Sequence, residues 1–143
     1  MDKRGFTLVE LVIVVIILGI ILTFALPNIT STLERNKKDQ MIIDAKDMVE
    51  KAKNYALKTS GGYPSNNGDC KSYNLAIVDS REEIKDSPFG EKYNRTDSYV
   101  EICLNAGSYE YKVYLIDNNN NRINKTNYLD LDKSGKYNKV IIS

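Results

Sequence analysis

Few side chains in this sequence could do chemistry, and one of them lies where a charge is costly. The run 6–26, FTLVELVIVVIILGIILTFAL, contains a single charged residue, Glu10. As a helix this run would span about 30 Å, which matches the apolar core of a bilayer. A carboxylate at such depth costs roughly 2.5–3.5 kcal/mol on insertion scales, so we interpret Glu10 as a functional residue.

The chain has no histidine. This removes the commonest general base and the commonest transition-metal ligand. Nucleophiles of the Ser-His and Cys-His kinds are therefore excluded. No other nucleophile or paired-carboxylate motif is evident, and we expect neither enzymatic activity nor a cofactor.

The two cysteines, Cys70 and Cys103, lie in the polar part of the chain. On the exported side of a membrane they are predicted to form a disulfide, because two cysteines without a histidine do not complete a zinc site. A bridge across this loop would contribute roughly 3–4 kcal/mol in the chain-entropy description. The alternative of two reduced thiols stays open for a strictly reducing habitat.

A weak ion-binding pattern occurs at 130–135, where DLDKSG matches the opening of an EF-hand calcium loop. Its candidate ligands are Asp130, Asp132 and Ser134. The twelfth position is Ile141 instead of the bidentate glutamate. An ordinary turn also explains the run, because Asp and Ser cap turns and Gly supplies a positive φ. We therefore expect no metal here.

The N-terminal run has three interpretations. It could be a signal peptide cleaved near the small residues of 23–25, a plain signal anchor, or a segment in which Glu10 has a partner. The first two leave Glu10 unexplained. Lys3 and Arg4 mark the cytoplasmic side by the positive-inside rule, so the C-terminal domain should face outward.

The motif GFTLVE at 5–10, followed by an unbroken apolar stretch, resembles the N-terminus of type IV prepilins and pseudopilins with a short leader. The match extends over 3–27. The resemblance implies that a prepilin peptidase cleaves after Gly5 and then methylates the new amine of Phe6. It also implies that the subunit is first a single-pass protein of the cytoplasmic membrane. Subunits would then self-associate into an extracellular filament with the help of an assembly platform membrane protein.

This resemblance supplies a partner for Glu10. Cleavage creates a cation at Phe6, which needs an anion in lipid as much as Glu10 needs a cation. The two residues are four apart and share a helix face, but the family implies pairing with a neighbouring subunit, which would make Glu10 the assembly determinant. Gly19 and Pro27 weaken the helix. Gly19 could be a close-packing point and Pro27 a simple kink where the helix leaves the membrane. The resemblance implies that this segment also unwinds in the filament, which is compatible with a kink in the membrane.

The remainder of the chain predicts an α+β fold: a long N-terminal helix, protruding and membrane-spanning in its first half, packed on a three- to four-stranded antiparallel sheet. After Pro27, apolar residues recur at intervals of three and four residues. This pattern indicates an amphipathic helix that ends at the TSGG run, 59–62. Residues 61–98 are mostly turn-forming, although NLAIV at 74–78 could be a strand or a helical turn. Period-two patterns predict strands at 99–105, 109–117 and 137–142.

These elements define the expected organisation and function. The expected parts are a leader (1–5), a transmembrane and filament-core helix (6–27) and a globular pilin domain (28–143) made of a helix (28–60), a loop (61–98) and a sheet (99–143). We expect a structural subunit of a type IV pilus that serves adhesion, twitching motility or aggregation. The alternative is a pseudopilin of a type II secretion or DNA-uptake (competence) system. A net charge of +1 gives no basic field, so nucleic acid is expected as a partner only for a DNA-uptake pseudopilin.

Overall fold

The computed structural model describes residues 5–143, apart from the side chains of Pro27 and Asn28. The chain forms two compact units, Met1–Asn36 and Lys37–Ser143. Helix α1, Leu8–Lys58, contributes its N-terminal part to the first unit and its C-terminal part to the second. The order of the elements agrees with the predicted α+β class, in which a long helix precedes an antiparallel sheet.

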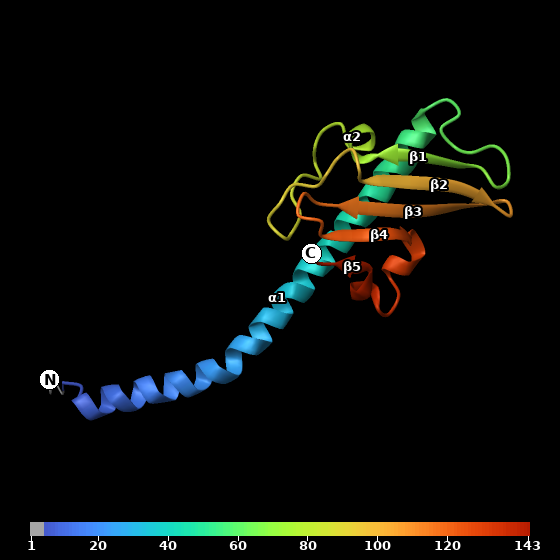
Figure 1. Cartoon of the computed structure of the whole chain (residues 1–143). Coiled ribbons are helices and arrows are strands. Elements are labelled where there is room, and N and C mark those ends of the chain that lie inside the picture. Colours follow the sequence, from blue (N-terminus) through green and yellow to red (C-terminus); the bar gives the residue numbers. More distant parts are fainter. Residues whose placement is uncertain (1–4) are drawn as a thin grey trace. The chain divides into compact units, whose positions relative to one another are not determined.

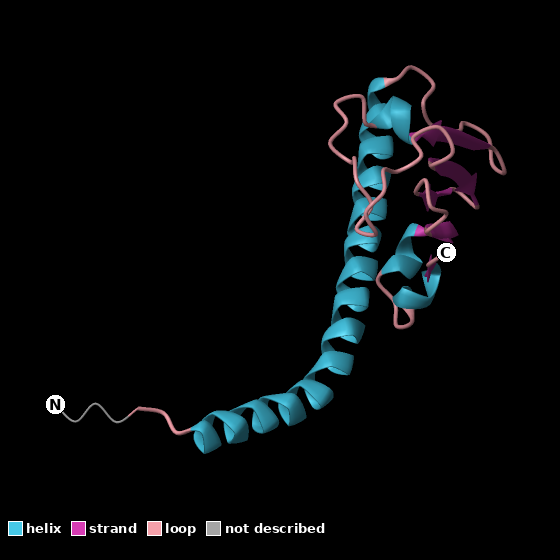
Figure 2. Ribbon diagram, turned by 60° about the vertical axis from the view of Figure 1, so that its left-hand side comes forward, coloured by secondary structure: helices cyan, strands magenta, loops and turns pink. Residues whose placement is uncertain are grey.

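The C-terminal part of α1 covers one face of the sheet, as Figures 1 and 2 show. Its buried positions recur at intervals of three and four residues, which places them on one side of the helix. They are Met41, Ile42, Ala45, Met48, Val49, Ala52 and Ala56. The predicted amphipathic pattern is therefore confirmed from Met41 onward, and this apolar stripe holds the helix on the sheet, whereas Ile29 and Leu33 remain exposed.

The sheet has five antiparallel strands in the order β1-β2-β3-β4-β5, each paired with its neighbours in sequence. The strands are β1 (Cys70–Asn74), β2 (Tyr99–Asn105), β3 (Ser108–Ile116), β4 (Arg122–Asn127) and β5 (Val140–Ile141). A short helix, α2 (Leu75–Val78), follows β1, and two 3-10 turns, η1 (Tyr128–Leu131) and η2 (Lys136–Lys139), precede β5.

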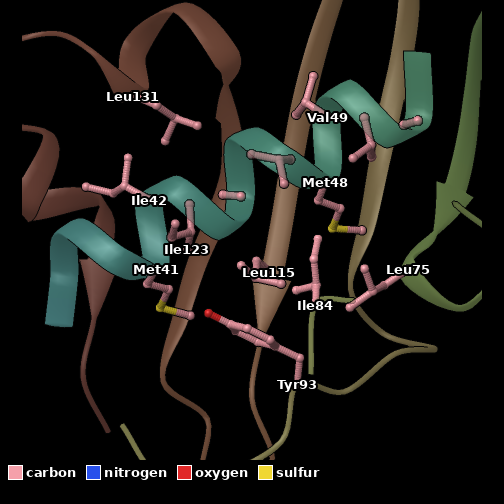
Figure 3. Packing of buried hydrophobic residues seen from close by; sticks show 14 of the residues in the cluster. Met41, Ile42, Met48, Val49, Leu75, Ile84, Tyr93, Leu115, Ile123 and Leu131 are labelled. Carbon is pink, nitrogen blue, oxygen red and sulfur yellow. The ribbon is translucent and has the colours of Figure 1, made fainter. Parts of the chain in front are cut away.

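The core of the second unit lies between α1 and the sheet (Figure 3). The sheet contributes alternate residues of its strands, as the period of two requires. The fully buried ones are Val100, Ile102, Val113, Leu115 and Ile123. Side chains from α2, from the loops and from η1 also belong to this core, namely Leu75, Ile84, Tyr93 and Leu131.

The C-terminal end of α1 agrees with the predicted stop. The helix ends at Lys58, and Gly61 adopts a positive φ of 68°. Gly62 then passes so close to the last turn that an added Cβ would lie 2.2 Å from the carbonyl oxygen of Ala56. Glycine is therefore required there because the backbone turns back against the helix.

The sheet corrects three sequence-based expectations. Strand β1 lies within 61–98, which was predicted as mostly turn-forming. All five of its residues are exposed or half-buried, so no apolar pattern marks it. Strand β4 was not predicted, because Ile123 and Thr126 are its only buried residues and an irregularity between Val113 and Leu115 of β3 disturbs the register opposite them.

The third correction concerns the end of the chain. The strand predicted at 137–142 is instead the turn η2 followed by β5, which has only two residues. Gly135, with φ of 84°, precedes η2 in the left-handed conformation and starts this turn. The ambiguous segment at 74–78 forms the helical turn α2, where the side chain of Asn74 accepts a hydrogen bond from the Ile77 amide at 3.1 Å.

Candidate functional site

The start of α1 forms a capping box. Thr7 stands directly before the helix, and its hydroxyl accepts a hydrogen bond from the Glu10 amide at 3.3 Å. In return, one carboxylate oxygen of Glu10, Oε2, accepts from the Thr7 amide at 2.9 Å and from the Thr7 hydroxyl at 3.0 Å. This reciprocal pairing satisfies amide groups that the first helical turn leaves without carbonyl partners. Glu10 is therefore held in place by Thr7.

The sequence analysis did not assign a role to Thr7. The signal was present, because Thr7 and Glu10 form the pattern T-x-x-E immediately before an apolar run. Besides its charge, Glu10 therefore has a second property, which is hydrogen bonding to the start of the helix.

Apolar side chains surround Glu10 on all sides of the helix. Among them, Phe6 is 78% and Leu8 is 80% exposed. Part of α1 near the N-terminus is long and apolar enough to cross a membrane, and none of that stretch is buried. Within residues 5–143, Thr7 is the hydrogen-bonding partner of the Glu10 carboxylate, and both of its bonds go to Oε2.

Helix α1 passes through both residues that were predicted to weaken it. It is continuous over Gly19 and Pro27 in the isolated chain. A Cβ added at Gly19 would meet nothing within 4 Å, so this glycine packs against no other described part of the chain. The unwinding predicted for this segment concerns the assembled filament and stays a prediction.

The predicted leader falls mostly on residues 1–4, which lie outside the described residues. This applies to Lys3 and Arg4, the cytoplasmic markers. Gly5 and Phe6, on either side of the predicted cleavage point, are described and exposed, and both precede the first residue of α1. An exposed bond outside a helix is accessible to a peptidase, although cleavage itself stays a prediction.

Residues 1–26 match the family model described as the prokaryotic N-terminal methylation motif, which is characteristic of type IV pilins and pseudopilins. No curated protein and no solved structure matches the chain. The motif, at the head of a long apolar helix that leads into an α+β unit, supports the type IV pilin and pseudopilin class. Such a motif implies a prepilin peptidase substrate that is anchored in a membrane before filament assembly.

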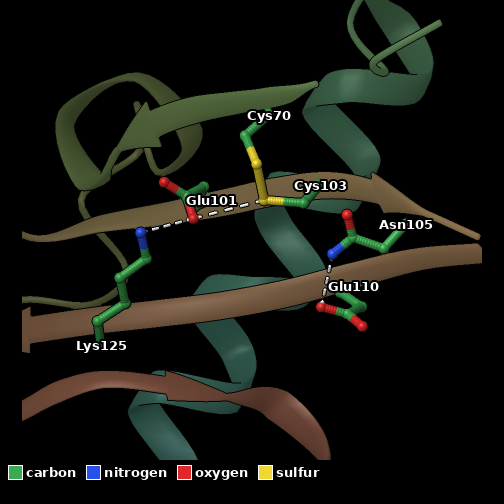
Figure 4. Close-up of a disulfide and its surroundings, with 6 residues drawn as sticks. All are labelled: Cys70, Glu101, Cys103, Asn105, Glu110 and Lys125. Atoms are coloured by element: carbon green, nitrogen blue, oxygen red, sulfur yellow. Dashed lines mark hydrogen bonds and ion pairs between the residues drawn. A yellow bond between two sulfur atoms is a disulfide. The ribbon is translucent and has the colours of Figure 1, made fainter. Parts of the chain in front are cut away.

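The predicted disulfide is present, because Cys70 of β1 and Cys103 of β2 are joined, with 4.0 Å between their Cα atoms. The two residues are direct partners in the register of the two strands. The bridge therefore ties the edge strand β1, and the loop before it, to the neighbouring strand β2 (Figure 4).

The candidate calcium ligands have lysine partners. The carboxylate of Asp130 pairs with Lys133 at 2.7 Å, and this hydrogen bond lowers the pKa of Asp130 below its usual value. Asp132 pairs with Lys46 of α1. The first ion pair lies within the turn, and the second joins the turn to the helix, which is a structural role for the DLDKSG run.

Proposed function

We propose that this protein is the structural subunit of an extracellular type IV pilus. It would be held as a single-pass protein in the cytoplasmic membrane, cleaved between Gly5 and Phe6, methylated on Phe6 and then added to the filament. The observation that carries the proposal is the N-terminal methylation motif on a helix whose apolar side chains are exposed all round. A structural and not a catalytic role is part of this proposal.

The exposed apolar side chains of the first unit would be removed from water by two environments in succession. Lipid covers them while the subunit waits in the membrane, and the helices of other copies cover them in the filament. Removal of the leader leaves a subunit suited to close packing. Side-chain cations fall from 20 to 18 with Lys3 and Arg4, and anions fall from 19 to 18 with Asp2. Long-range repulsion between copies is then small.

Glu10 would direct each incoming subunit. One of its oxygens is occupied by Thr7, which fixes the side chain near the start of the helix. The other oxygen would receive the methylated amine of Phe6 from a neighbouring copy. Joining the two charges in an apolar filament core removes the cost of leaving either one unpaired, which is about 3–5 kcal/mol for a buried pair that loses one member. Partners in this pathway are the prepilin peptidase, which is also the methyltransferase, and the assembly platform protein.

Strains that carry Glu10→Ala, Glu10→Gln or Thr7→Ala in place of the wild-type gene test this role. Both Glu10 variants should be cleaved and recovered from membranes, yet their amount in sheared surface fibres should fall at least tenfold. Thr7→Ala loses a helix cap worth about 1 kcal/mol but keeps the charge, so we expect a smaller loss. Glu91→Ala, at an exposed carboxylate of the second unit, is the matched control and should assemble normally.

Electron microscopy and immunoblots of membrane and fibre fractions provide the readout. Wild-type amounts of fibre from the Glu10→Ala strain would refute the assembly role. The alternative function, a pseudopilin, predicts a different wild-type result: no long surface fibres, together with loss of protein secretion or DNA uptake when the gene is deleted. That outcome would replace the pilus proposal.

A further inference from the structure

Three side chains capable of binding a metal meet on the sheet face that points away from α1 (Figure 4). They are Cys70, Cys103 and Glu101, and one donor atom of each lies within 4.8 Å of the others. Among the described residues, no other group of three or more His, Cys, Asp or Glu side chains comes together in this way. The sequence analysis found two sulfur ligands and no third, because Glu101 approaches Cys70 only through strand pairing.

The register of β1 and β2 determines this arrangement. Cys70 lies directly opposite Cys103. Glu101 precedes Cys103 by two residues in the same strand, so both side chains are on the same face. The intervening Ile102 is fully buried on the opposite face, against the core. The three donors are thus positioned by paired strands, without a loop that would have to close around an ion.

The cluster is accessible from solvent at one side. Strand β1 is an edge strand that pairs only with β2, and Cys70 is exposed on it. Cys103 is buried and Glu101 is half-buried. The ammonium of Lys125 lies 2.6 Å from Oε2 of Glu101. A small reductant can therefore reach the disulfide through Cys70, while the other two donors remain held by the sheet.

We propose that the reduced subunit binds one Zn²⁺, or a similar thiophilic divalent cation, through the Sγ atoms of Cys70 and Cys103 and a carboxylate oxygen of Glu101. Water would take the fourth position of a tetrahedral site, as it does in zinc sites with three protein ligands. In the oxidised subunit the two sulfur atoms are bonded to each other, so that form does not bind the ion.

The two states interconvert by ordinary thiol chemistry. Two molecules of a low-molecular-weight thiol, RSH, reduce the bridge to two cysteine thiols and leave as RSSR. The cation then displaces one proton from each thiol. Two thiolates and the Glu101 carboxylate supply three negative charges against the two positive charges of the ion. Lys125 supplies the remaining positive charge, so the occupied site is neutral.

The metal would replace the disulfide as the connection between β1 and β2. Without either, β1 would be attached to the sheet edge by its hydrogen bonds and its few partly buried side chains alone. The edge strand β1 would thus be connected to β2 by the disulfide in oxidising surroundings and by the metal ion in reducing surroundings.

The full-length subunit, purified in detergent, provides the test. It is reduced with a phosphine, freed of reductant without oxygen and titrated with Co²⁺, whose thiolate complexes absorb strongly. Wild type should bind one Co²⁺ per chain, and Zn²⁺ should displace it. The oxidised protein and the variants Cys70→Ala and Cys103→Ala should show no thiolate band.

Two glutamates on the same sheet face provide matched variants. Glu101→Gln should weaken Co²⁺ binding at least tenfold, because it replaces a charged ligand by a neutral amide. Glu110→Gln should leave binding unchanged. Glu110 of β3 lies directly opposite Cys103 of β2. Its carboxylate accepts a hydrogen bond from the Asn105 side-chain amide at 3.0 Å and does not belong to the cluster.

Three results would each overturn the proposal. The first is a reduced wild-type subunit that keeps its near-UV tyrosine dichroism but shows no cobalt–thiolate absorption. The second is equal affinity in Glu101→Gln and Glu110→Gln, which would show that Glu101 is not a ligand. The third is a reduced subunit that loses its tyrosine dichroism and does not regain it with Co²⁺ or Zn²⁺.

Discussion

The N-terminal and C-terminal parts of α1 carry similar apolar side chains and differ in what covers them. In the C-terminal part, apolar residues occupy one stripe, which the sheet buries, while charged residues occupy the rest of the surface. In the N-terminal part they occupy every side, and the described side chains stay exposed. One region specifies a partner within the chain. The other leaves its apolar side chains uncovered within the chain, and under the proposed function lipid and then other copies cover them.

The same charge, placed once in the core that the C-terminal part of α1 packs against and once in the N-terminal part of α1, should test the comparison most strongly. Leu115 of β3 lies in that core, and Leu22 lies in the N-terminal part of α1. Leu115 is 0% and Leu22 is 54% exposed. Leu115→Asp should lower the unfolding free energy of the second unit by more than about 4 kcal/mol, because an unpaired carboxylate enters the core. Leu22→Asp should change it by less than about 0.5 kcal/mol and instead reduce recovery in the membrane fraction.

Urea denaturation followed by tyrosine dichroism measures the first effect, and membrane fractionation measures the second. Leu22→Ala is the control for the position, because it keeps the segment apolar. Unfolding of the second unit by Leu22→Asp would show that the first unit supports that core, contrary to the comparison.

Removing the disulfide should produce the next largest effect, confined to the second unit. The bridge joins residues 33 positions apart. A closed loop of that size contributes about 3–4 kcal/mol in the chain-entropy description. The double variant Cys70→Ala, Cys103→Ala should lose about that much unfolding free energy in urea, yet enter the membrane as wild type does. Ser72→Ala, at an exposed position of β1, is the control. Equal stability of the double variant and wild type would contradict the expectation.

The contacts of the Asp79 carboxylate predict a smaller effect on the unfolding free energy, and one that depends on pH. Burial raises the pKa of this carboxyl, but hydrogen bonds from the Ile84 and Glu83 amides, together with Arg95 and Lys51, lower it more, so the net pKa lies below the usual value. Because the folded-state pKa is depressed, this stabilisation is present above the unfolded pKa of about 3.9 and is lost as the pH falls through the folded pKa.

Asp79→Asn should therefore lower the unfolding free energy of the second unit by about 1–3 kcal/mol at neutral pH. The difference from wild type should shrink in acid. Urea titrations at a series of pH values measure it. Asp86→Asn, at an exposed position in the same loop, should have no effect above about 0.5 kcal/mol. A difference between wild type and Asp79→Asn that stays constant down to low pH would refute the role of the charge.

The elements with strong patterns were predictable from the sequence. The apolar run and its single charge predicted the N-terminal helix, and β2 was predicted with its bounds, 99–105, because Val100 and Ile102 alternate with polar residues. Strands β1 and β4 were not predictable, since their pairing with neighbours, and not their composition, makes them strands. The same reason applies to Glu101, whose approach to Cys70 depends on register. Thr7 was predictable from its spacing to Glu10.

The central claim concerns the mature N-terminus, and the most direct measurement is tandem mass spectrometry of the subunit recovered from sheared surface fibres. The account predicts that the chain begins at Phe6 and that its α-amino group is methylated. A subunit that keeps Met1, or one that begins after Ala25 as a cleaved signal peptide would require, would contradict it.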